Sequence, residues 1–498
     1  MSIPVLSDGT GVLLARESAP GVQPVAGWQQ IQANPGGITD WTRQNVEVRH
    51  DPLSPNLTPE SGEVVGYDVS PKLALDLSRD LLNVIREPAF RSLTKHAGGK
   101  GQSRQAVTGV TSTGYTVASL GDLAAGRLIQ ATGFTNAANN GLKIVVAAST
   151  GTETKAAGLV VEAAPPANAI IEVAGVQGAA ADVTIDVNGD IGTTALDCTT
   201  LGLVPGQRSV IGDLTSGAAF GFATAAYNGR AIVKGPITAT KIPLMLRSWT
   251  VGAQDLGAGK TIRLLFTRAI RNVPMFDTDY LPSPTLCGEI SEPGAGAAGA
   301  TDRTYGGGLG LDDLTLDIPV EGKITATLGF VGMNMTDPGP TQATGSSTAL
   351  APLQAGVFST ASKMKGRLVK KSDESTLSVD INGMKVTLKN NITPMKELFV
   401  SGAANLIYGA YMPTLSLEAY VIDNKMTLAA NANTSGMLEF LLQNADGGFG
   451  MFFPLVQLRK PSKAYAAHTA VMISNDVNAV RDPSTGLLQT LSEFAYLP

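Results

Sequence analysis

One stretch of the chain constrains its fold more than any other, the residues from Leu314 to Phe330, LTLDIPVEGKITATLGF. Apolar residues stand at every second position on both sides of Glu321-Gly322, at Leu314, Leu316, Ile318 and Val320 and then at Ile324, Ala326, Leu328 and Phe330. Successive side chains of a strand point to opposite faces. A period of two over this length therefore predicts an antiparallel hairpin with one buried face.

The same alternation returns elsewhere in the chain. It occurs at Val65, Tyr67 and Val69, at Leu73, Leu75 and Leu77, and at Leu415, Leu417, Ala419 and Val421. Helical spacing follows Ser78, which is expected to cap a short helix that ends at Pro88. Asn382-Gly383 and Asp446-Gly447-Gly448 stand between apolar runs and predict hairpin turns. The chain is expected to be mainly β, with antiparallel sheets and short helices.

The composition agrees with a β-rich protein of several domains. The chain has 498 residues, which is too long for one ordinary core, so two to four domains are expected. It contains 56 Gly and 28 Pro, and aromatic residues are only 5%, which suits many short strands and turns. Charged residues are 16% and the net charge is −5. Such sparse charge favours burial of neutral surface between subunits, and the lack of a basic cluster argues against tight nucleic-acid binding.

The cysteines and the N-terminal residues bear on the cellular location. Cys198 and Cys287 form neither a disulfide framework nor a metal motif, and both are expected to be buried, reduced thiols. The first residues, MSIPVLSDGTGVLL, have no basic region followed by an apolar run, so no signal peptide is expected. No stretch approaches the ~20 apolar residues of a membrane span. A protein made in the cytoplasm, soluble there and without membrane contact is expected.

A loose internal repeat lies in the Ala-, Gly-, Thr- and Val-rich region from about residue 105 to 262. One copy covers Leu123 to Ala164 and the other Leu203 to Ser248. Each has a Gly after an apolar turn, Gly126 and Gly206, and Asn-Gly before a β-rich run, at 140–141 and 228–229. We interpret them as two small inserted β-modules, with a chance match of short β-patterns as the alternative.

Several segments look like ligand sites but lack required residues. GAGKT, Gly257 to Thr261, lacks the first Gly of a phosphate-binding loop, since Gln254 stands there, and is interpreted as a turn before a strand. TYGGGLGLDD, Thr304 to Asp313, has Leu311 where the dinucleotide fingerprint ends in Gly, and is interpreted as a flexible loop or a bulge.

A calcium loop is the last of these candidate sites. Asp186, Asn188, Asp190 and Asp197 have its spacing, but Ile191 replaces its Gly and no helices flank it. A polar turn is favoured, and Asp186, Asn188 and Asp190 stay as a weak candidate metal loop. His50, His96 and His468 are scattered. No catalytic residue and no cofactor are expected.

Taken together, several segments resemble the major tail tube proteins of long-tailed bacteriophages, in the group in which one chain carries two tube domains. These segments are ARESAPGVQPVAGWQQI, RHDPLSPN, SGEVVGYDVSPKLALDL, LTLDIPVEGKITATLGFVGMN, and the part from DINGMKVTLKNN through SLEAYV to FFPLVQL. The stretch LIQATGFTNAANNGLKIVVAAS is similar to the small β-modules that such proteins carry outside the tube. The inserts from 105 to 262 depart from the plainest members of the family.

The resemblance implies an architecture and a mechanical role. A first tube domain would comprise 1–104 and 263–336, followed by inserted β-modules at 105–180 and 181–262, a linker at 337–350, and a second tube domain at 351–498. Each tube domain would be an antiparallel β-sandwich whose sheets join neighbours into a closed barrel. Three chains would form a pseudo-sixfold ring, and stacked rings would form the conduit for DNA ejection. Partners would be other copies, the tape measure protein, and the tail terminator and distal tail proteins, in a virion assembled in the host cytoplasm.

The resemblance also implies which residues face the lumen and which lie between rings. Lumen-facing candidates are Thr315, Asp317, Lys323, Thr325 and Thr327, with Leu415 to Val421 in the same sheet. Inter-ring loop candidates are Arg49, His50, Asp51, Glu60 and Glu63, and the segment Asp337 to Leu350 would bridge rings or subunits as well. A neutral or negative lumen would let DNA slide, because adhesion to phosphates needs positive charge.

Two other functions remain open from the sequence. In the first, the chain is a phage or cell-surface adhesin whose modules bind carbohydrate. The inserts contain few aromatic residues for stacking on sugars, which counts against it. In the second, the chain is a β-rich enzyme such as a polysaccharide lyase, for which no recognisable site is present.

Overall fold

The computed structural model describes residues 10–48, 62–96, 104–117, 123–249, 252, 254–295, 300–348, 357–359, 365–378, 381–421, 424–444, 447–465 and 471–498. The chain forms two compact units, each assembled from separate stretches of sequence. Unit 1 comprises Met1–Ser92, Pro274–Thr360 and Asn382–Glu418, and unit 2 comprises Leu93–Val273, Ala361–Ile381 and Ala419–Pro498.

The described residues of unit 1 form strands, one α-helix and a 3-10 turn. These are β1 (Gly11–Arg16), β2 (Gln29–Ile31), β3 (Ala33–Thr39), β4 (Gln44–Val48), β5 (Glu63–Asp68), β6 (Lys72–Asp76), α1 (Arg79–Phe90), β22 (Thr285–Glu292), β23 (Asp302–Ile318), β24 (Thr325–Val331), β25 (Asn334–Met335), η8 (Ser346–Thr348), β28 (Ile381–Lys389), β29 (Ile392–Met395), β30 (Asn405–Tyr408) and β31 (Met412–Tyr420). The end residues of β28 and β31 extend into unit 2.

Unit 2 contains the inserted modules and the C-terminal strands. Its module elements are β8 (Arg104–Val110), β9 (Gly114–Val117), β10 (Arg127–Thr132), η3 (Ala137–Asn139), β11 (Gly141–Ile144), β12 (Glu153–Lys155), β13 (Ile170–Gln177), β14 (Val183–Ile185), β15 (Ile191–Thr193), η4 (Cys198–Leu201), β16 (Arg208–Ile211), η5 (Ala218–Phe220), η6 (Ala225–Tyr227), β17 (Gly229–Val233), β18 (Lys241–Ile242), β19 (Leu244–Met245) and β20 (Arg263–Leu265). Strands β7 (Lys95–His96) and β21 (Arg268–Arg271) flank the modules in the sequence and pair with each other. The others are β26 (Lys365–Lys370), β27 (Thr376–Ser378), α2 (Lys425–Asn431), β32 (Ser435–Asn444), β33 (Gly447–Ala464), β34 (Met472–Ala479) and β35 (Thr490–Phe494).

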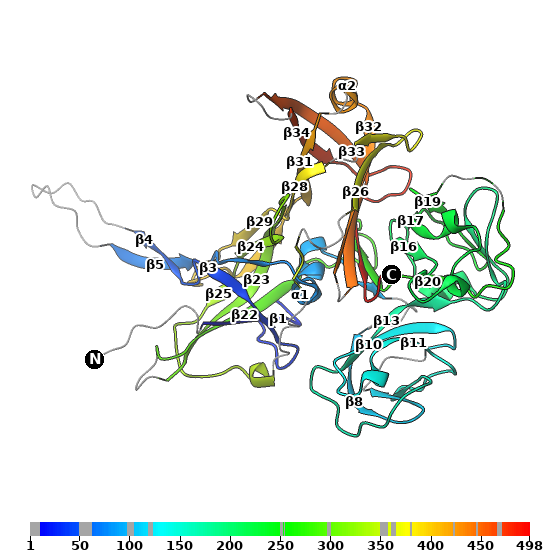
Figure 1. Cartoon of the computed structure of the whole chain (residues 1–498). Coiled ribbons are helices and arrows are strands. Elements are labelled where there is room, and N and C mark those ends of the chain that lie inside the picture. The colour runs from blue at the N-terminus through cyan, green and yellow to red at the C-terminus, as the bar shows by residue number, and fades with distance from the viewer. Residues whose placement is uncertain are drawn as a thin grey trace, which may run out of the picture. The chain divides into compact units, whose positions relative to one another are not determined.

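The centre of unit 1 is an antiparallel sheet with the strand order β3–β6–β24–β23–β28–β31 (Figure 1). Its core face consists of directly opposed rows, Leu73–Leu328–Leu314–Leu388 and Leu75–Ala326–Leu316–Val386, and every one of these side chains is buried. The hairpin and its buried face are therefore confirmed. Val320 is the exception and is 52% exposed, because β23 ends at Ile318 and Val320 lies in the turn before Gly322.

Helix α1 starts where the sequence predicts and ends later. The Ser78 hydroxyl accepts the Leu81 backbone N–H at 3.2 Å, as an N-cap should. The prediction that Pro88 ends the helix is wrong, since the helix continues through Pro88 to Phe90. A proline there removes one hydrogen bond, while the two residues that follow it, Ala89 and Phe90, are almost completely buried. The helix ends at Arg91, which has a left-handed backbone with φ of 54°.

The internal repeat predicted from the sequence has a counterpart in the strand pairing of the two modules. In the first module β10 pairs with β11 and β13, and in the second β16 pairs with β17 and β20 (cyan and green in Figure 1). The turn GFTNAANNG at 133–141 corresponds to GFATAAYNG at 221–229, and each contains a 3-10 helix. Gly126 and Gly206 both need a positive φ, 86° and 84°. A chance match of short patterns would not reproduce pairing, turn and backbone conformation together.

The modules share one core. Their last strands, β13 and β20, pair antiparallel with each other, so the sheet runs β11–β10–β13–β20–β16–β17 across both modules. Buried residues from Val107 to Phe266 form a single hydrophobic cluster. The two modules therefore form one structural body with a continuous sheet and a common core.

In the rest of unit 2, β26, β32, β33 and β34 form an antiparallel sheet, and β35 and β21 extend it. The hairpin predicted around Gly447-Gly448 is confirmed by the pairing of Asn444 with Gly447, whereas Asp446 lies outside the described residues. The turn predicted at Asn382-Gly383 is wrong, because both residues lie inside the continuous strand β28. Gly383 does not adopt the positive φ that an Asn-Gly hairpin turn requires, so the strand passes straight through.

A second, larger repeat runs through the chain. The order β1-β2-β3-β4-β5-β6-α1-β22-β23-β24 returns as β26-β27-β28-β29-β30-β31-α2-β32-β33-β34, and the pairs β1–β2, β1–β22, β22–β23 and β23–β24 have counterparts in β26–β27, β26–β32, β32–β33 and β33–β34. The sequence PKLALDL at 71–77 corresponds to PTLSLEA at 413–419. The compact units do not coincide with these repeats, because unit 1 also contains most of β28 to β31.

Candidate functional site

The face of the unit 1 sheet opposite its core carries a polar array. This array consists of three opposed rows, Lys72–Gly329–Asp313–Lys389, Ala74–Thr327–Thr315–Thr387 and Asp76–Thr325–Asp317–Lys385. The hydroxyl oxygens of Thr315 and Thr387 lie 3.1 Å apart across neighbouring strands. Period-two geometry puts these side chains on one face because every second residue of each strand belongs to the core face.

Four of the five lumen-facing candidates belong to the polar array, namely Thr315, Asp317, Thr325 and Thr327. The fifth, Lys323, lies in the turn, and its ammonium is 2.6 Å from a carboxylate oxygen of Asp76. Sequence reasoning missed Lys385, Thr387 and Lys389, because it placed a turn at Asn382-Gly383 and so did not see that β28 borders β23.

The polar array has no surplus of either charge. It contains three lysines and three aspartates, and no apolar side chain in it is larger than alanine. Burial, and secondly the neighbouring Asp312, raise the pKa of the Asp313 carboxyl. A surface of this kind offers hydroxyls and balanced charges to water but no net positive charge to a polyanion.

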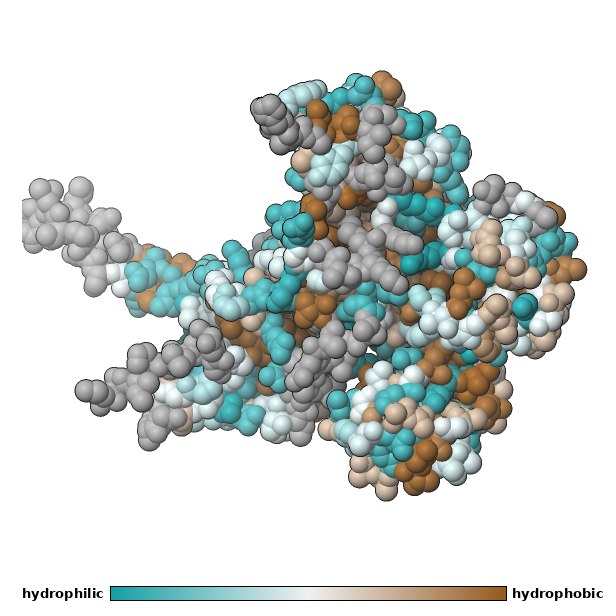
Figure 2. Space-filling view, viewed as in Figure 1, coloured by the Kyte–Doolittle hydropathy of each residue, from teal (hydrophilic) through white to brown (hydrophobic). Residues whose placement is uncertain are grey.

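Strands β4 and β5 form an arm that extends from the unit 1 sheet (Figure 1). The candidates Arg49, His50, Asp51 and Glu60 lie outside the described residues. Glu63 is exposed in β5, opposite Val48. Val48, Val64 and Val65 are each more than half exposed, and Figure 2 shows brown and teal residues side by side on this arm. Exposed valines on a projecting ribbon are typical of a contact surface.

The tip of the β29–β30 hairpin is a second exposed apolar feature. Leu398 is 87% exposed and Phe399 is fully exposed, with a left-handed backbone at Phe399. The loop is held to the arm by the Tyr67 N–H, which donates to the Ser401 carbonyl at 2.9 Å, and by Lys396, 2.7 Å from Asp68. Sequence reasoning did not single out this tip, although the short apolar run Leu398-Phe399-Val400 between Glu397 and Ser401 was its signal.

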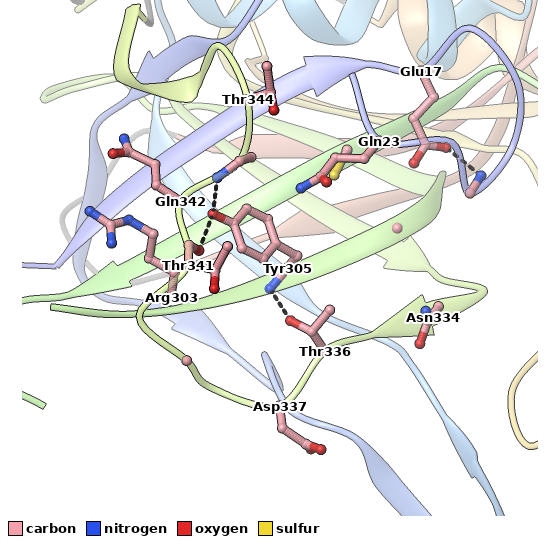
Figure 3. Close-up of a pocket in the computed structure, with 15 residues that line it drawn as sticks. Glu17, Gln23, Arg303, Tyr305, Asn334, Thr336, Asp337, Thr341, Gln342 and Thr344 are labelled. Atoms are coloured by element: carbon pink, nitrogen blue, oxygen red, sulfur yellow. Dashed lines mark hydrogen bonds between the residues drawn. The ribbon is translucent and has the colours of Figure 1, made fainter. Parts of the chain in front are cut away.

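The segment after β25, expected to be a linker, is held against β23 over its described part. Backbone N–H groups of Arg303 and Gly339 donate to each other's carbonyls at 2.7 and 3.0 Å. The Tyr305 hydroxyl accepts the Ala343 N–H and donates to the Thr341 carbonyl (Figure 3). The segment lines part of an open pocket of about 470 Å³, and Glu17 lies at one end of this pocket. Both Glu17 oxygens accept backbone N–H groups, from Gly21 and Gly308, and burial raises its pKa.

The weak candidate metal loop is occupied by side chains of the protein. The Lys241 ammonium lies 2.8 Å from Asp186 and 3.0 Å from Asp190. One Asp186 oxygen accepts the backbone N–H groups of Asn188 and Asp190, which is the pattern of a polar turn. A cation already sits between the two carboxylates, and within the described part of the chain no group of three His, Cys, Asp or Glu residues could hold a metal ion.

A family profile described as phage tail tube protein matches residues 7–479 of the chain. The chain belongs to the phage tail tube protein family. No curated protein matches it closely enough to count as a relative.

Family membership makes the chain a structural component of phage tails, so its functional features are surfaces.

The remaining motifs of the sequence are structural. Cys198 and Cys287 are both buried and unpaired with each other, as expected. GAGKT is a turn before β20, closed by the Lys260 N–H on the Gly257 carbonyl. TYGGGLGLDD lies in β23 with register shifts on both sides, so it is a bulged strand and not a flexible loop. Neither helix in the described residues is long and apolar enough to cross a membrane.

Proposed function

We propose that the chain polymerises into stacked rings that form the phage tail tube, and that the polar array lines the channel through which viral DNA is ejected. The observation that carries this proposal is the polar array itself. One face of the unit 1 sheet carries rows of buried, mainly leucine side chains. The polar array on the opposite face carries threonines and equal numbers of lysines and aspartates, without a large apolar side chain. DNA can slide past such a face because few phosphates would be neutralised by fixed cations.

The proposed ring contains three chains, each supplying two tube domains. The repeat of ten elements supports two domains of one kind in every chain. The proposed division is 1–104 with 263–336 for the first tube domain, 105–180 and 181–262 for modules that face outward, 337–350 for a connection, and 351–498 for the second tube domain. The chain acts without catalysis in this role.

Ring stacking is proposed to use the arm and the hairpin tip. The arm carries exposed valines, and Phe399 stands fully in solvent beside it. Burying such side chains against the next ring would be favourable by roughly 1.5–3 kcal/mol for a phenylalanine. The same contact, repeated head to tail, generates a filament. Partners at the tube ends and inside it would be the tail terminator, the distal tail proteins and the tape measure protein.

Electron microscopy of the purified protein tests the proposal. We expect tubes with a regular ring repeat and a central channel at high protein concentration. A three-dimensional reconstruction should place Thr315, Thr327 and Thr387 on the channel wall. Discrete particles at every concentration, or tubes whose channel is lined by another face, would contradict it.

A further inference from the structure

One junction between the two large repeats is already present within a single chain. Strand β23 of the first repeat pairs antiparallel with β28 of the second, from Asp313 opposite Lys389 to Ile318 opposite Met384. The other edge of the same part of β23 is taken by β24. The chain therefore shows how the sheet of one repeat continues into the sheet of the next.

The second repeat has the same strand, β33, but lacks the corresponding neighbour. From Leu458 to Ala464 one edge of β33 pairs with β34. On the opposite edge, the pairing with β32 stops at Gln457, opposite Ser435. Among the described strands, none pairs with β33 beyond that point on this edge.

The first repeat has the complementary gap. Its strand β3 stands where β28 stands in the second repeat, and the registers of β3 are all with β6. Both edges of β28 are used, one by β23 and one by β31. The second edge of β3 has no strand on it in the described part of the molecule. Unpaired edges of this kind are templates for pairing with another chain.

We propose that β33 of one copy pairs antiparallel with β3 of a second copy, repeating between copies the β23–β28 junction within the chain. This inference rests on the proposed ring, and it names the two edges that close it. Each copy offers one of each edge, so the contact is head to tail and suits a closed ring.

The repeat also gives a register for this junction. On β33, the buried Leu458 opposite Val477 corresponds to Leu314 opposite Leu328, which puts Arg459 in the place of Thr315. On β3, Ile38-Thr39 corresponds to Val386-Thr387, since Thr39 and Thr387 both stand five residues before the first strand of a hairpin, β4 or β29. Thr315 lies opposite Thr387. Arg459 of one copy should therefore lie opposite Thr39 of the next.

Disulfide cross-linking of the full chain tests this register. Opposed residues on paired strands have Cβ atoms ~5 Å apart, close enough for a disulfide after small adjustment. The test variant carries Thr39→Cys and Arg459→Cys. The control carries Thr39→Cys and Asn478→Cys, because Asn478 is exposed on β34, one strand further away, opposite Gln457. The native Cys198 and Cys287 are buried in both variants. Mild oxidation and non-reducing electrophoresis give the readout.

We expect most of the test variant to run as cross-linked multimers that revert to monomer on reduction, and at least tenfold less cross-linking in the control. Mixing the two single variants should yield only dimers. If rings form by electron microscopy but the test pair cross-links no better than the control, the strand junction is wrong while the tube proposal stands. If neither rings nor cross-links form at any concentration, the tube proposal fails and the junction fails with it.

Discussion

The carboxamide of Asn228 makes the same two hydrogen bonds in the second module as that of Asn140 makes in the first. Asn140 accepts the Phe134 N–H at 3.0 Å and donates to the Phe134 carbonyl at 2.8 Å. Asn228 does the same with Phe222, at 2.6 and 2.8 Å. In each module the asparagine imitates a strand partner and closes the loop that precedes the Asn-Gly turn.

Replacing either asparagine should loosen its own module. We expect Asn140→Ala and Asn228→Ala each to cost about 1–2 kcal/mol, since two hydrogen bonds are lost and the backbone of a phenylalanine is left unpaired. Hydrogen exchange measured by mass spectrometry should speed up in peptides containing Phe134 or Phe222 respectively. Asn188→Ala is the matched control, an exposed asparagine that also precedes glycine. If Asn188→Ala speeds hydrogen exchange as much as Asn140→Ala and Asn228→Ala do, the hydrogen bonds of Asn140 and Asn228 contribute nothing specific to their modules.

A buried arginine is expected to be essential for unit 2. Arg268 on β21 lies 2.9 Å from Glu172 of the first module and 2.8 Å from Glu493 on β35, and all three side chains are almost fully buried. Arg268→Met would remove the buried cation that bridges the two carboxylates, which should cost about 3–5 kcal/mol. Calorimetric melting should show the loss, and adding Glu172→Gln and Glu493→Gln should restore part of it. If the triple variant melts no higher than Arg268→Met alone, Arg268 stabilises unit 2 through packing and not through its charge.

Acid should weaken unit 2 through Asp482. Burial acts to raise the pKa of this carboxyl, but the ammonium of Lys371, 2.6 Å away, and the hydroxyls of Thr485 and Ser484 outweigh burial and lower the pKa. A carboxyl whose folded pKa is depressed stabilises the fold above its unfolded pKa of about 4, and this stabilisation is lost as the pH falls through the folded value.

The measurement is urea unfolding of unit 2 at pH 7 and near pH 3. Asp482→Asn should lower stability at pH 7 and reduce the difference between the two pH values. Asp476→Asn, at an exposed aspartate of β34, is the control and should leave that difference unchanged. An unaltered pH dependence in Asp482→Asn would remove Asp482 from the list of acid-sensitive groups.

How far the sequence predicts this structure depends on whether the information is local. Alternation fixes both faces of the Leu314–Phe330 hairpin because a strand's period is a local property. Asn382-Gly383 misled the prediction, since its turn propensity yields to the pairing of β28 with two neighbours. The neighbour relation of Thr315 and Thr387, 72 residues apart, depends on how the sheet closes, and no local pattern encodes it. In the sequence, the module repeat shows only as matching positions of Gly and Asn-Gly. The two hydrogen bonds that each asparagine makes with a phenylalanine backbone become apparent only in the structure.

The exposed hairpin tip should matter for assembly and not for folding. Phe399 is fully exposed with φ of 69°, so Phe399→Asn keeps a residue that tolerates this backbone and removes the apolar ring. We expect an unchanged melting temperature and a several-fold higher protein concentration for tube formation, measured by light scattering and electron microscopy. Val187→Asn, at an exposed valine of the second module, is the control. Tubes that form equally well with Phe399→Asn would exclude the tip from the ring contacts.

Adding positive charge to the polar array should slow the passage of DNA. Thr315 and Thr327 oppose each other in the middle row, so Thr315→Lys and Thr327→Lys together place two new cations at the same level of every chain. Each cation that meets a phosphate adds salt-dependent binding through counterion release. In phage assembled with this variant, we expect tubes of normal length but DNA ejection slowed by more than tenfold at low salt, recovering as salt is raised. Thr315→Gln with Thr327→Gln controls for side-chain bulk and should eject at close to the normal rate. Equal ejection rates for the lysine and glutamine variants at low salt would mean that this face of the sheet does not line the path of the DNA.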